Sequence, residues 1–324
     1  MVRFGVIGSS RITDWVIEGA MLDARFQLSA VYSRSLDRGR EFAAKYGVTQ
    51  VFTDFESMSQ NIDAVYIASP NAFHKEQALF FLQRGIPVLC EKPLCSNARE
   101  AAQIIETAQK HQTLLMEAMI STLNPNFLAL KNHLHSVGTV RKYFASFCQY
   151  SSSYDNFKKG VIENKFKNEL SNGALMDIGI YTIYPMVVLF GKPLGVKATG
   201  YMLPSCVDGS GSALFEYDDM DGVAIYSKIS NSSLSSEVEG EEGNLVLDRI
   251  HTPRQLIFKP KNKETLDLSA IHCGNDYYYE IKEFIDLMEN KKIEHEVNSH
   301  QNSLMVMELM DEIRRQIGLI YPAD

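Results

Sequence analysis

The chain has 324 residues and a formal net charge of −8, because 32 Lys and Arg residues stand against 40 Asp and Glu residues. A protein this acidic has no electrostatic reason to hold a phosphate backbone, so we expect no general nucleic-acid binding. Hydrophobic residues make up 45% of the chain and charged residues 22%, which are ordinary globular values that exclude disordered, collagen-like and coiled-coil proteins. At roughly 150 residues per domain, the length predicts two domains.

The first 118 residues alternate short apolar runs with helical patterns. The predicted strands are Arg3–Ile7, Gln27–Tyr32, Ala64–Ala68, Pro87–Cys90 and Leu114–Met116. The predicted helices are Ile12–Leu22, Leu36–Tyr46, His74–Arg84 and Ala98–His111. Strands with near-continuous apolar runs are buried on both faces of a sheet, and their alternation with helices indicates right-handed βαβ units. Residues 1–118 are therefore predicted to form an α/β domain with a doubly wound parallel sheet.

Strand patterns dominate the rest of the chain, residues 119–324. The predicted linker between the two domains is Ala118–Asn124. The predicted strands are Val140–Tyr150, Val196–Tyr201, Ser212–Tyr217, Val223–Ser230, Ser235–Glu239, Asn244–Leu247 and Gln255–Phe258. The predicted helices are Asn126–His135, Gly173–Phe190, Tyr277–Glu289 and Ser303–Ile317. Turn-forming residues separate successive strands, so we expect an α+β domain with a mostly antiparallel sheet.

The turn after the first strand carries part of a dinucleotide-binding fingerprint. In the G-x-G-x-x-G pattern, the glycines give a tight turn, a close approach to the pyrophosphate and close helix packing. Gly8 fits the first position, whereas Ser10 and Thr13 stand at the second and third. The N–H groups at the start of the next helix favour a phosphate, and a plain turn without a ligand is the alternative. The predicted contacts are Gly8, Ser9, Ser10, Arg11 and Ile12.

The end of the second strand indicates which dinucleotide is bound. An NAD site usually has Asp or Glu there for the ribose hydroxyls, whereas this chain has Ser33 and Arg34. A guanidinium pairs well with a 2′-phosphate, and a serine hydroxyl adds a hydrogen bond. We therefore expect NADP(H) in preference to NAD(H), with Arg38 one helical turn further on as a second contact. The alternative is that both arginines are solvated surface residues.

Polar residues follow the next two predicted strands of the parallel sheet. Open α/β sheets bind ligands at the carboxyl ends of their strands, so these residues are candidate cofactor contacts. They are Ser69, Pro70, Asn71, His74, Glu91 and Lys92. Lys92 is either a surface charge or a cation near the nicotinamide, and the bond to Pro93 is one that can be cis. His74 can equally well serve only to begin a helix.

The composition also bears on metal binding and location. The five cysteines form no CxxC pair, and the histidines show no metal-ligand spacing, so we expect buried thiols in a reducing cytosol and no metal. The N-terminus runs straight into a strand pattern without the regions of a signal peptide. No apolar run approaches the ~20 residues of a membrane-spanning helix, so we expect a cytoplasmic protein without a membrane partner.

The motifs together resemble the Gfo/Idh/MocA oxidoreductases. The resemblance rests on Gly-Val-Ile-Gly at 5–8, Ser-Pro-Asn-x-x-His at 69–74, Glu-Lys-Pro at 91–93 and Asn-Gly-Ala-Leu-Met-Asp-Ile-Gly-Ile-Tyr at 172–181. It covers essentially the whole chain, including Glu280-Ile281-x-x-Phe284. It implies an N-terminal Rossmann domain and a C-terminal domain with a large open sheet, through which the protein would form a homodimer or higher homo-oligomer.

The resemblance also implies site residues. Lys92 matches the family's active-site lysine, and Asp177 matches the aspartate of the second signature. Many members have a histidine four residues later, where this chain has Tyr181. A tyrosine there is similar to the branch that contains dimeric dihydrodiol dehydrogenase, NADP-dependent xylose dehydrogenase and glucose–fructose oxidoreductase. The missing acid after the second strand agrees with the use of NADP in that branch.

These residues suggest a mechanism. Asp177 and Tyr181 are four apart on a predicted helix and so share one face. Tyr181 is the candidate proton donor to a new alkoxide, Lys92 would favour its phenolate form and hydrogen-bond the substrate oxygen, and Asp177 would orient a hydroxyl or the lysine. An aromatic residue packed in the core is the alternative for Tyr181. The segment Tyr150–Asn156 is either a polar loop or part of a polyol pocket.

The leading prediction is an NADP(H)-dependent dehydrogenase or reductase acting on a sugar, polyol, vicinal diol or hydroxy-carbonyl compound. The alternative is a non-catalytic dinucleotide-binding sensor or regulator of the same fold, which needs the phosphate turn but none of Lys92, Asp177 and Tyr181. A third possibility is an enzyme that reduces an imine-like or tetrapyrrole substrate.

Overall fold

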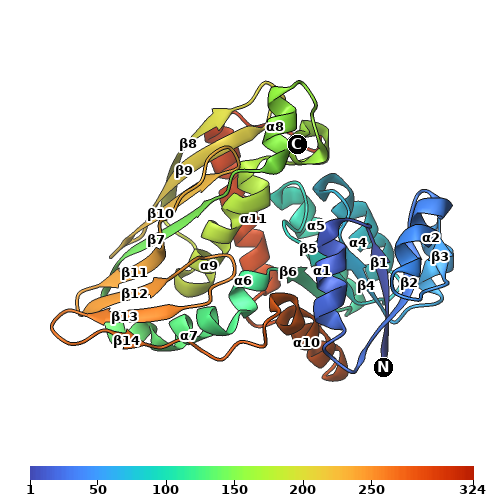
Figure 1. Ribbon diagram of the computed structural model, residues 1–324, viewed down its shortest axis with the longest axis horizontal. Coiled ribbons are helices and arrows are strands. Elements are labelled where there is room, and N and C mark those ends of the chain that lie inside the picture. Colours follow the sequence, from blue (N-terminus) through green and yellow to red (C-terminus); the bar gives the residue numbers. More distant parts are fainter. The chain divides into compact units, whose positions relative to one another are not determined.

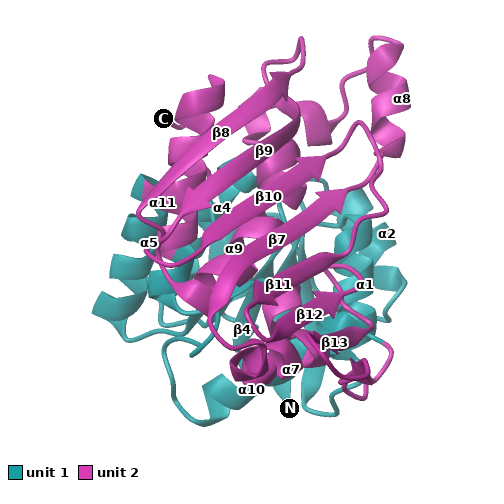
Figure 2. Ribbon diagram, turned by 90° about the vertical axis from the view of Figure 1, so that its left-hand side faces the viewer, with its two compact units in different colours: residues 1–95, 99–119, 275–303 teal, residues 96–98, 120–274, 304–324 magenta.

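A computed structural model describes residues 1–324, which form two compact units (Figures 1 and 2). The first unit contains Met1–Cys95, Arg99–Met119 and Asn275–Ser303, and the second contains Ser96–Ala98, Ile120–Gly274 and Leu304–Asp324. The sequence-based division at residue 119 assigns residues 275–303 to the second domain, whereas they pack with the first unit. An amphipathic helix shows that one face is buried but not which neighbour covers it.

The first unit is built on a parallel sheet with the strand order β3-β2-β1-β4-β5-β6. The strands are β1 (Val2–Ile7), β2 (Phe26–Tyr32), β3 (Val51–Phe52), β4 (Ala64–Ile67), β5 (Val88–Glu91) and β6 (Leu115–Ala118). The order reverses between β1 and β4, which is where open α/β sheets form their ligand-binding crevice. The doubly wound parallel sheet predicted from the apolar runs is confirmed.

Helices cover this sheet. They are α1 (Arg11–Ala20), α2 (Leu36–Ala44), α3 (Phe55–Ser59), α4 (His74–Leu82), α5 (Ala98–His111) and α10 (Asp276–Glu289). α10 lies against α1 at Gly19, where an added Cβ atom would come within 2.7 Å of the Cβ atom of Tyr277. α10 also reaches the core beneath the sheet, because the rings of Phe284 and Phe4 are 5.8 Å apart.

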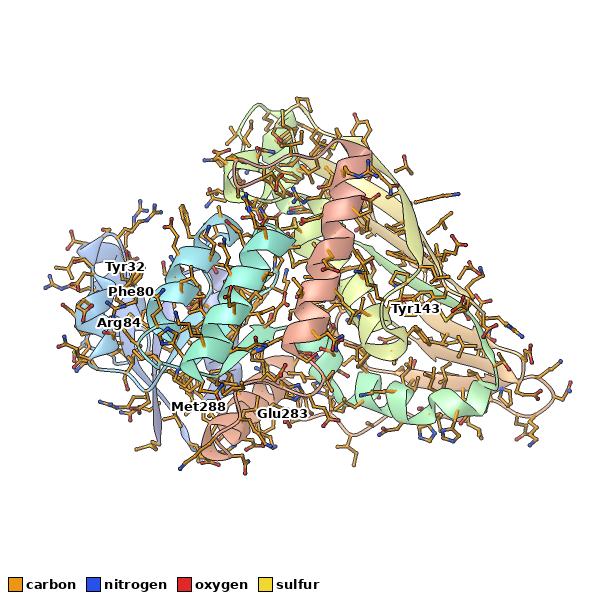
Figure 3. The ribbon with its side chains drawn as sticks, turned by 180° about the vertical axis from the view of Figure 1, so that it is seen from behind. Tyr32, Phe80, Arg84, Tyr143, Glu283 and Met288 are labelled. Atoms are coloured by element: carbon orange, nitrogen blue, oxygen red, sulfur yellow. The ribbon has the colours of Figure 1, made fainter.

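The short elements β3 and α3 were not predicted, since two and five residues carry no readable period. Aromatic packing holds α3 in place: the Phe55 ring is 4.3 Å from that of Tyr32 and 5.5 Å from that of Phe80. The Asp54 side chain caps α3 by accepting a hydrogen bond from the Ser57 N–H group. On the outside, the Arg84 guanidinium covers the Phe80 ring at 3.6 Å (Figure 3).

The second unit is built on an eight-stranded sheet with the order β14-β13-β12-β11-β7-β10-β9-β8. Its strands are β7 (Val140–Cys148), β8 (Gly195–Met202), β9 (Asp208–Glu216), β10 (Asp221–Ser227), β11 (Ser236–Gly240), β12 (Gly243–Leu247), β13 (Leu256–Pro260) and β14 (Leu266–Asp267). All neighbouring pairs are antiparallel except β7 and β10, which run parallel. The prediction of a mostly antiparallel sheet is confirmed.

The remaining helices lie wholly or mostly in this unit. They are α6 (Ile120–Leu123), α7 (Pro125–His133), α8 (Ser152–Lys158), α9 (Ile180–Phe190) and α11 (His300–Ile317). The Tyr143 hydroxyl on β7, labelled in Figure 3, donates a 3.0 Å hydrogen bond to the Thr182 carbonyl on α9. Figure 2 shows α9 and α11 behind the sheet and the opposite face of β8–β11 open.

The helix predicted at Gly173–Phe190 is not uniform. Leu175–Gly179 form a π-helical turn, and only the residues from Ile180 onward are α-helical. Such turns occur often at functional sites. The stretch Asn168–Phe190 is also long and apolar enough by length and composition to cross a membrane, contrary to the expectation from the sequence. Its most apolar window is 72% buried inside the protein, as in the core helix of a folded domain.

Of the two alternatives for Tyr150–Asn156, the polar loop is wrong, because Ser152–Lys158 form α8. Tyr154 and Phe157 of α8 pack against a small buried cluster of Phe166, Leu203 and Val207. Three serines in a row favour a loop locally, but burial of the two aromatic rings provides the stabilisation that the serines lack.

Candidate active site

The turn after β1 has a backbone that only glycine adopts easily. Gly8 has φ +110°, and a Cβ atom there would lie 2.4 Å from the Ala68 carbonyl oxygen at the end of β4. Any side chain at position 8 is therefore excluded, both by the backbone conformation and by the lack of space. The resulting close approach of β1 and β4 lies at the point where the strand order reverses, so the turn can bring its backbone close to a ligand.

Ser9, Ser10 and Arg11 follow Gly8 on the exposed surface, and Ile12 is half-buried. Ser10 is the N-cap residue of α1, but its side chain makes no capping hydrogen bond to the helix backbone. Its hydroxyl instead lies 3.5 Å from that of Thr13, which is fully buried. The serine and threonine that replace fingerprint glycines are thus accommodated, and the α1 N-terminus can still bind an anion.

The end of β2 presents a cation. Ser33 donates its N–H group to the Phe52 carbonyl, and its hydroxyl accepts from the Ser35 N–H group at 3.3 Å. Arg34 is exposed, with its guanidinium 5.9 Å from the centre of the Phe73 ring. Arg38 is also exposed, on the first turn of α2. This arrangement offers donors to an anionic group and no carboxylate at the positions directly after β2.

Residues 69–74 connect β4 to α4. Ser69 donates its hydroxyl to the Gln77 amide oxygen at 2.7 Å, while Pro70 is half-buried and Asn71 is buried. His74 is fully enclosed, and its ring nitrogens lie 2.7 Å from the Ser69 carbonyl and 3.0 Å from the Pro93 carbonyl. Burial lowers the pKa of His74. The imidazole therefore lies between the loops after β4 and β5 and links them.

The loop after β5 is held from a second side. Lys92 is half-buried and its bond to Pro93 is cis. The next N–H group, that of Leu94, donates a 2.9 Å hydrogen bond to the buried carboxylate of Glu117 on β6. Pro93 C=O and Leu94 N–H belong to one peptide group, so the histidine and the carboxylate fix both its ends. Burial raises the pKa of Glu117 to about 7.

A second buried acid lies beneath these strands. Glu91 on β5 is buried and accepts a 2.6 Å hydrogen bond from the Tyr66 hydroxyl on β4. Glu280 on α10 is fully buried, and neither of its carboxylate oxygens has a hydrogen-bond partner. Burial, with the nearby Glu91, raises the pKa of Glu280 well above its ordinary value. The Glu91 side chain, predicted as a cofactor contact, is directed at Tyr66 inside the unit.

Replacing Glu280 by glutamine is expected to stabilise the protein at pH 8 by about 1–3 kcal/mol, because each unit by which folding raises the pKa costs about 1.4 kcal/mol where the unfolded chain is ionised, and glutamine is neutral at every pH. A carboxyl whose pKa is raised on folding binds more protons in the folded state. Its contribution to stability is full below the unfolded value of 4.5 and is lost as pH rises toward the folded value. Urea unfolding at pH 4.5 and pH 8 measures this, and an equal effect at both pH values would contradict it.

In the second unit, the π turn brings Asp177 to a buried lysine. Lys228, directly after β10, forms a 2.7 Å ion pair with the Asp177 carboxylate. The turn itself is anchored by Asp208 on β9, whose buried carboxylate accepts the Leu175 N–H group at 2.8 Å. Burial raises the pKa of Asp208 to about 6, opposed by the Leu175 hydrogen bond and by the Lys228 charge.

Tyr181 lies one turn further along the helix and is half-buried. Its ring packs edge-on against Phe147 at 5.6 Å, and Phe147 stacks face-to-face on His251 at 4.0 Å. Aromatic packing and a functional role are therefore compatible at Tyr181. Sequence reasoning missed Lys228, Asp208 and His251. The pairing of β9 and β10 brings Asp208 and Lys228 to the π turn, and the segment after β12 brings His251 to Phe147 and Tyr181, and no sequence spacing shows either.

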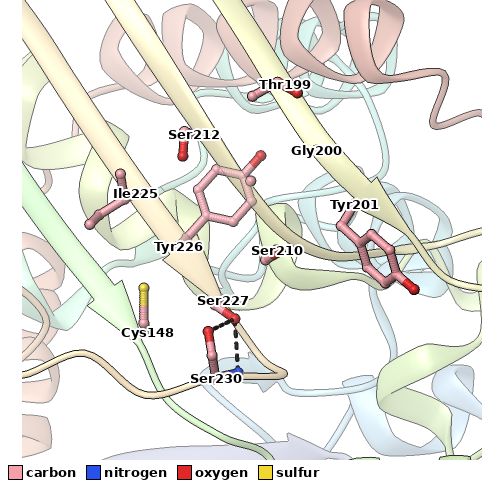
Figure 4. Close-up of a pocket in the computed structure, with 11 residues that line it drawn as sticks. Cys148, Thr199, Gly200, Tyr201, Ser210, Ser212, Ile225, Tyr226, Ser227 and Ser230 are labelled. Atoms are coloured by element: carbon pink, nitrogen blue, oxygen red, sulfur yellow. Dashed lines mark hydrogen bonds between the residues drawn. The ribbon is translucent and has the colours of Figure 1, made fainter.

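A separate open recess of about 440 Å³ lies on the other face of the sheet (Figure 4). Its walls include Thr199, Tyr201, Ser210, Ser212, Ile225 and Ser227. Side chains alternate along a strand, so Ile225 points away from the face on which its neighbour Tyr226 packs against Gly179 of the π turn. The recess is thus on the face opposite Asp177 and Tyr181.

Comparison with known protein families identifies the family of this chain. Residues 2–119 match the model of an oxidoreductase family with an NAD-binding Rossmann fold, and residues 133–246 match the Gfo/Idh/MocA C-terminal domain. The chain belongs to the Gfo/Idh/MocA oxidoreductase family. The family suggested by the sequence motifs is confirmed, and with it an enzyme of the oxidoreductase class.

Family members of known activity match the chain end to end. A protein of Bacillus subtilis strain 168 named scyllo-inositol 2-dehydrogenase (NADP(+)) IolU is 48% identical over 326 residues, covering 100% of this chain and 99% of its own. The mouse trans-1,2-dihydrobenzene-1,2-diol dehydrogenase is 26% identical over 338 residues, with the same coverage.

Solved structures share the fold. The 3-ketoreductase KijD10 of Actinomadura kijaniata, in complex with NADP and TDP-benzene, has a TM-score of 0.85 at 23% identity and covers 98% of each chain. A levoglucosan dehydrogenase in complex with NADH and levoglucosan has a TM-score of 0.86 at 18% identity, covering 98% of this chain and 97% of its own. Proteins with this fold thus bind either dinucleotide.

Proposed function

We propose that this chain is an NADP(H)-dependent oxidoreductase that moves a hydride between the nicotinamide and a CH–OH carbon of a sugar, polyol or vicinal diol. The observation that carries this is the 48% identity, over the whole chain, to a protein named scyllo-inositol 2-dehydrogenase (NADP(+)). The mouse relative named for a diol substrate agrees with it. A non-catalytic sensor would not need the ion-paired Asp177 and the half-buried Tyr181 in the second unit.

The first unit fits a dinucleotide. A Cβ atom at Gly8 would fill the space beside Ala68, and the α1 N-terminus carries no side-chain cap. We assign the pyrophosphate to this turn, and the 2′-phosphate of NADP to Ser33 and Arg34. When bound, the nicotinamide supplies or accepts the hydride. The absence of an acid directly after β2 supports NADP over NAD.

Lys92 and Tyr181 are the proposed proton-transfer pair. An alkoxide formed by reduction needs a proton, and the Tyr181 hydroxyl would donate it. An ammonium favours the phenolate form that remains, so Lys92 would assist the transfer and hydrogen-bond the substrate oxygen. Asp177 would accept a hydrogen bond from a neighbouring substrate hydroxyl. When an alcohol is oxidised, the same groups transfer the proton in the opposite direction.

The two parts of the chain would then have different tasks. We assign the cofactor to residues 1–118 and the substrate walls to residues 119–324, with α10 returning to support the first unit. The open face of the second sheet carries exposed apolar side chains such as Tyr201 and Leu214. We assign this face as the subunit interface of a homodimer or higher homo-oligomer. We further propose that the enzyme is cytoplasmic.

Thermal stabilisation by NADP+ and NAD+, followed by an oxidation screen, tests the proposed function. We expect the larger rise in Tm with NADP+ and turnover of at least one polyol or diol, scyllo-inositol and trans-1,2-dihydrobenzene-1,2-diol being the first to try. A larger rise with NAD+ would contradict the cofactor assignment. Binding of NADP+ without turnover across sugars, polyols and diols would favour the sensor.

A further inference from the structure

Lys228 is a buried lysine that no sequence motif marks. Its backbone continues β10: the N–H group donates to the Gly209 carbonyl at 2.9 Å, and its carbonyl accepts from the Ser151 N–H group at 2.9 Å. The backbone is therefore fixed on both sides. The side chain is only 3% exposed, which is rare for a lysine unless its charge is paired.

The Lys228 ammonium has three partners within the second unit. It lies 2.7 Å from Asp177 Oδ2, donates to the Lys165 carbonyl at 3.1 Å, and sits 4.9 Å from the centre of the buried Phe166 ring. The fully buried carboxylate of Asp208 also feels its charge. This shell fixes the ammonium position and pairs its charge with a carboxylate.

The pair is asymmetric in exposure. The Asp177 side chain is 31% exposed, against 3% for Lys228. The cation is thus hidden, and the Asp177 side chain is the part of the pair that a ligand can reach. A charge taken out of water is costly unless it is paired, so the buried ammonium strongly favours an ionised Asp177 in this one orientation.

We propose that Lys228 is a positioning residue that holds Asp177 ionised and aimed as the hydrogen-bond acceptor for a hydroxyl next to the reacting carbon. This inference rests on the proposed function and deepens it, because it selects polyols and vicinal diols over alcohols with a single hydroxyl. The hydroxyl that Asp177 accepts from does not react. Its hydrogen bond is therefore equally strong in the bound substrate and the transition state, and its loss appears in KM.

Steady-state kinetics of Lys228→Met test this role. We expect the KM for a polyol to rise about tenfold, as for the loss of one charge-assisted hydrogen bond, while kcat and the KM for NADP+ stay within about twofold. The matched control is Lys192→Met, which removes a lysine paired with Glu308 on the surface of the same unit and should change none of these constants. An unchanged polyol KM, or an equal fall in kcat and in affinity for both ligands, would overturn the proposal.

Two further variants separate positioning from simple structural support. On an Asp177→Asn background, Lys228→Met should add no further rise in KM, whereas additive effects would overturn the proposal. Asp177→Asn alone should lower Tm more than Lys228→Met alone, because it leaves the buried ammonium without its carboxylate. The double variant should recover part of that loss, and a Tm in the opposite order would overturn the pairing.

These outcomes are distinguishable from a failure of the proposed function. A wild-type protein that oxidises no polyol with NADP+ or NAD+ contradicts the proposed function, and with it the hydroxyl as the partner of Asp177. The Tm order of the three variants still decides whether Lys228 holds Asp177. Turnover by the wild type with no change in the variants instead overturns only the role of Lys228.

Discussion

Lys92→Met and Tyr181→Phe are each expected to lower kcat by about 10²–10⁴-fold, the usual contribution of a positioned acid–base group. Lys92 lies half-buried at the carboxyl end of β5, in a loop whose peptide group is fixed by His74 and Glu117. Tyr181 would lose only its hydroxyl, since phenylalanine keeps the edge-on packing against Phe147. Initial rates at saturating NADP+ and polyol measure both effects.

The same two kinds of substitution, made elsewhere in the chain, are the controls. Lys75→Met removes a lysine that pairs with Glu100 in the first unit, and Tyr217→Phe removes a hydroxyl that donates to the Gly191 carbonyl in the second. Each should leave kcat unchanged, and Lys75→Met should cost more stability than Tyr217→Phe because its partner Glu100 is buried. A Lys92 or Tyr181 variant that keeps near wild-type kcat contradicts its proposed role.

Arg34→Ala is expected to raise the KM for NADP+ by about 10–100-fold and to leave the KM for NAD+ nearly unchanged. The reason is that a charge-assisted hydrogen bond to a phosphate contributes roughly 1.5–3 kcal/mol, and only NADP+ carries the 2′-phosphate. Arg34 is exposed beside Phe73 and directly follows β2. Titration of each dinucleotide by initial rates gives the two constants.

Arg84→Ala is the matched control for this prediction. Arg84 is also an arginine stacked on a phenylalanine of the first unit, but it lies just after α4 and pairs with Glu56. Neither dinucleotide constant should change. If Arg34→Ala raises the KM for both dinucleotides equally, the guanidinium contacts a part that they share, and the basis for NADP preference is lost.

The parallel sheet of the first unit was predictable because its strands are buried on both faces. Val65 and Leu89 are fully buried, and such strands appear in the sequence as uninterrupted apolar runs bounded by helices. The family motifs lie at the ends of those runs, so the same pattern that predicts the sheet also predicts where Gly8 and Lys92 stand.

The surroundings of the site were not predictable in the same way. Glu117, Asp208 and Lys228 are buried polar residues. They stand in sequence segments that look like any other strand, so no motif marks them. Their surroundings depend on how the strands pair. For example, Ser227 on β10 lies opposite Cys148 on β7, and this register determines where the next residue, Lys228, lies. His74 is a further example: the sequence marks it as a motif residue, but only the fold shows that its ring nitrogens lie against the Ser69 and Pro93 carbonyls.

The return of α10 to the first unit has a consequence for how the protein is made. As the chain leaves the ribosome, the six-stranded sheet is complete once residue 118 has emerged. The helix that covers Gly19 of α1 and packs on Phe4 is synthesised only after the whole second sheet. At ~5–20 residues per second, that interval lasts roughly 10–30 seconds. Throughout that interval, the surface of the first unit that α10 covers at Gly19 stays without its covering helix.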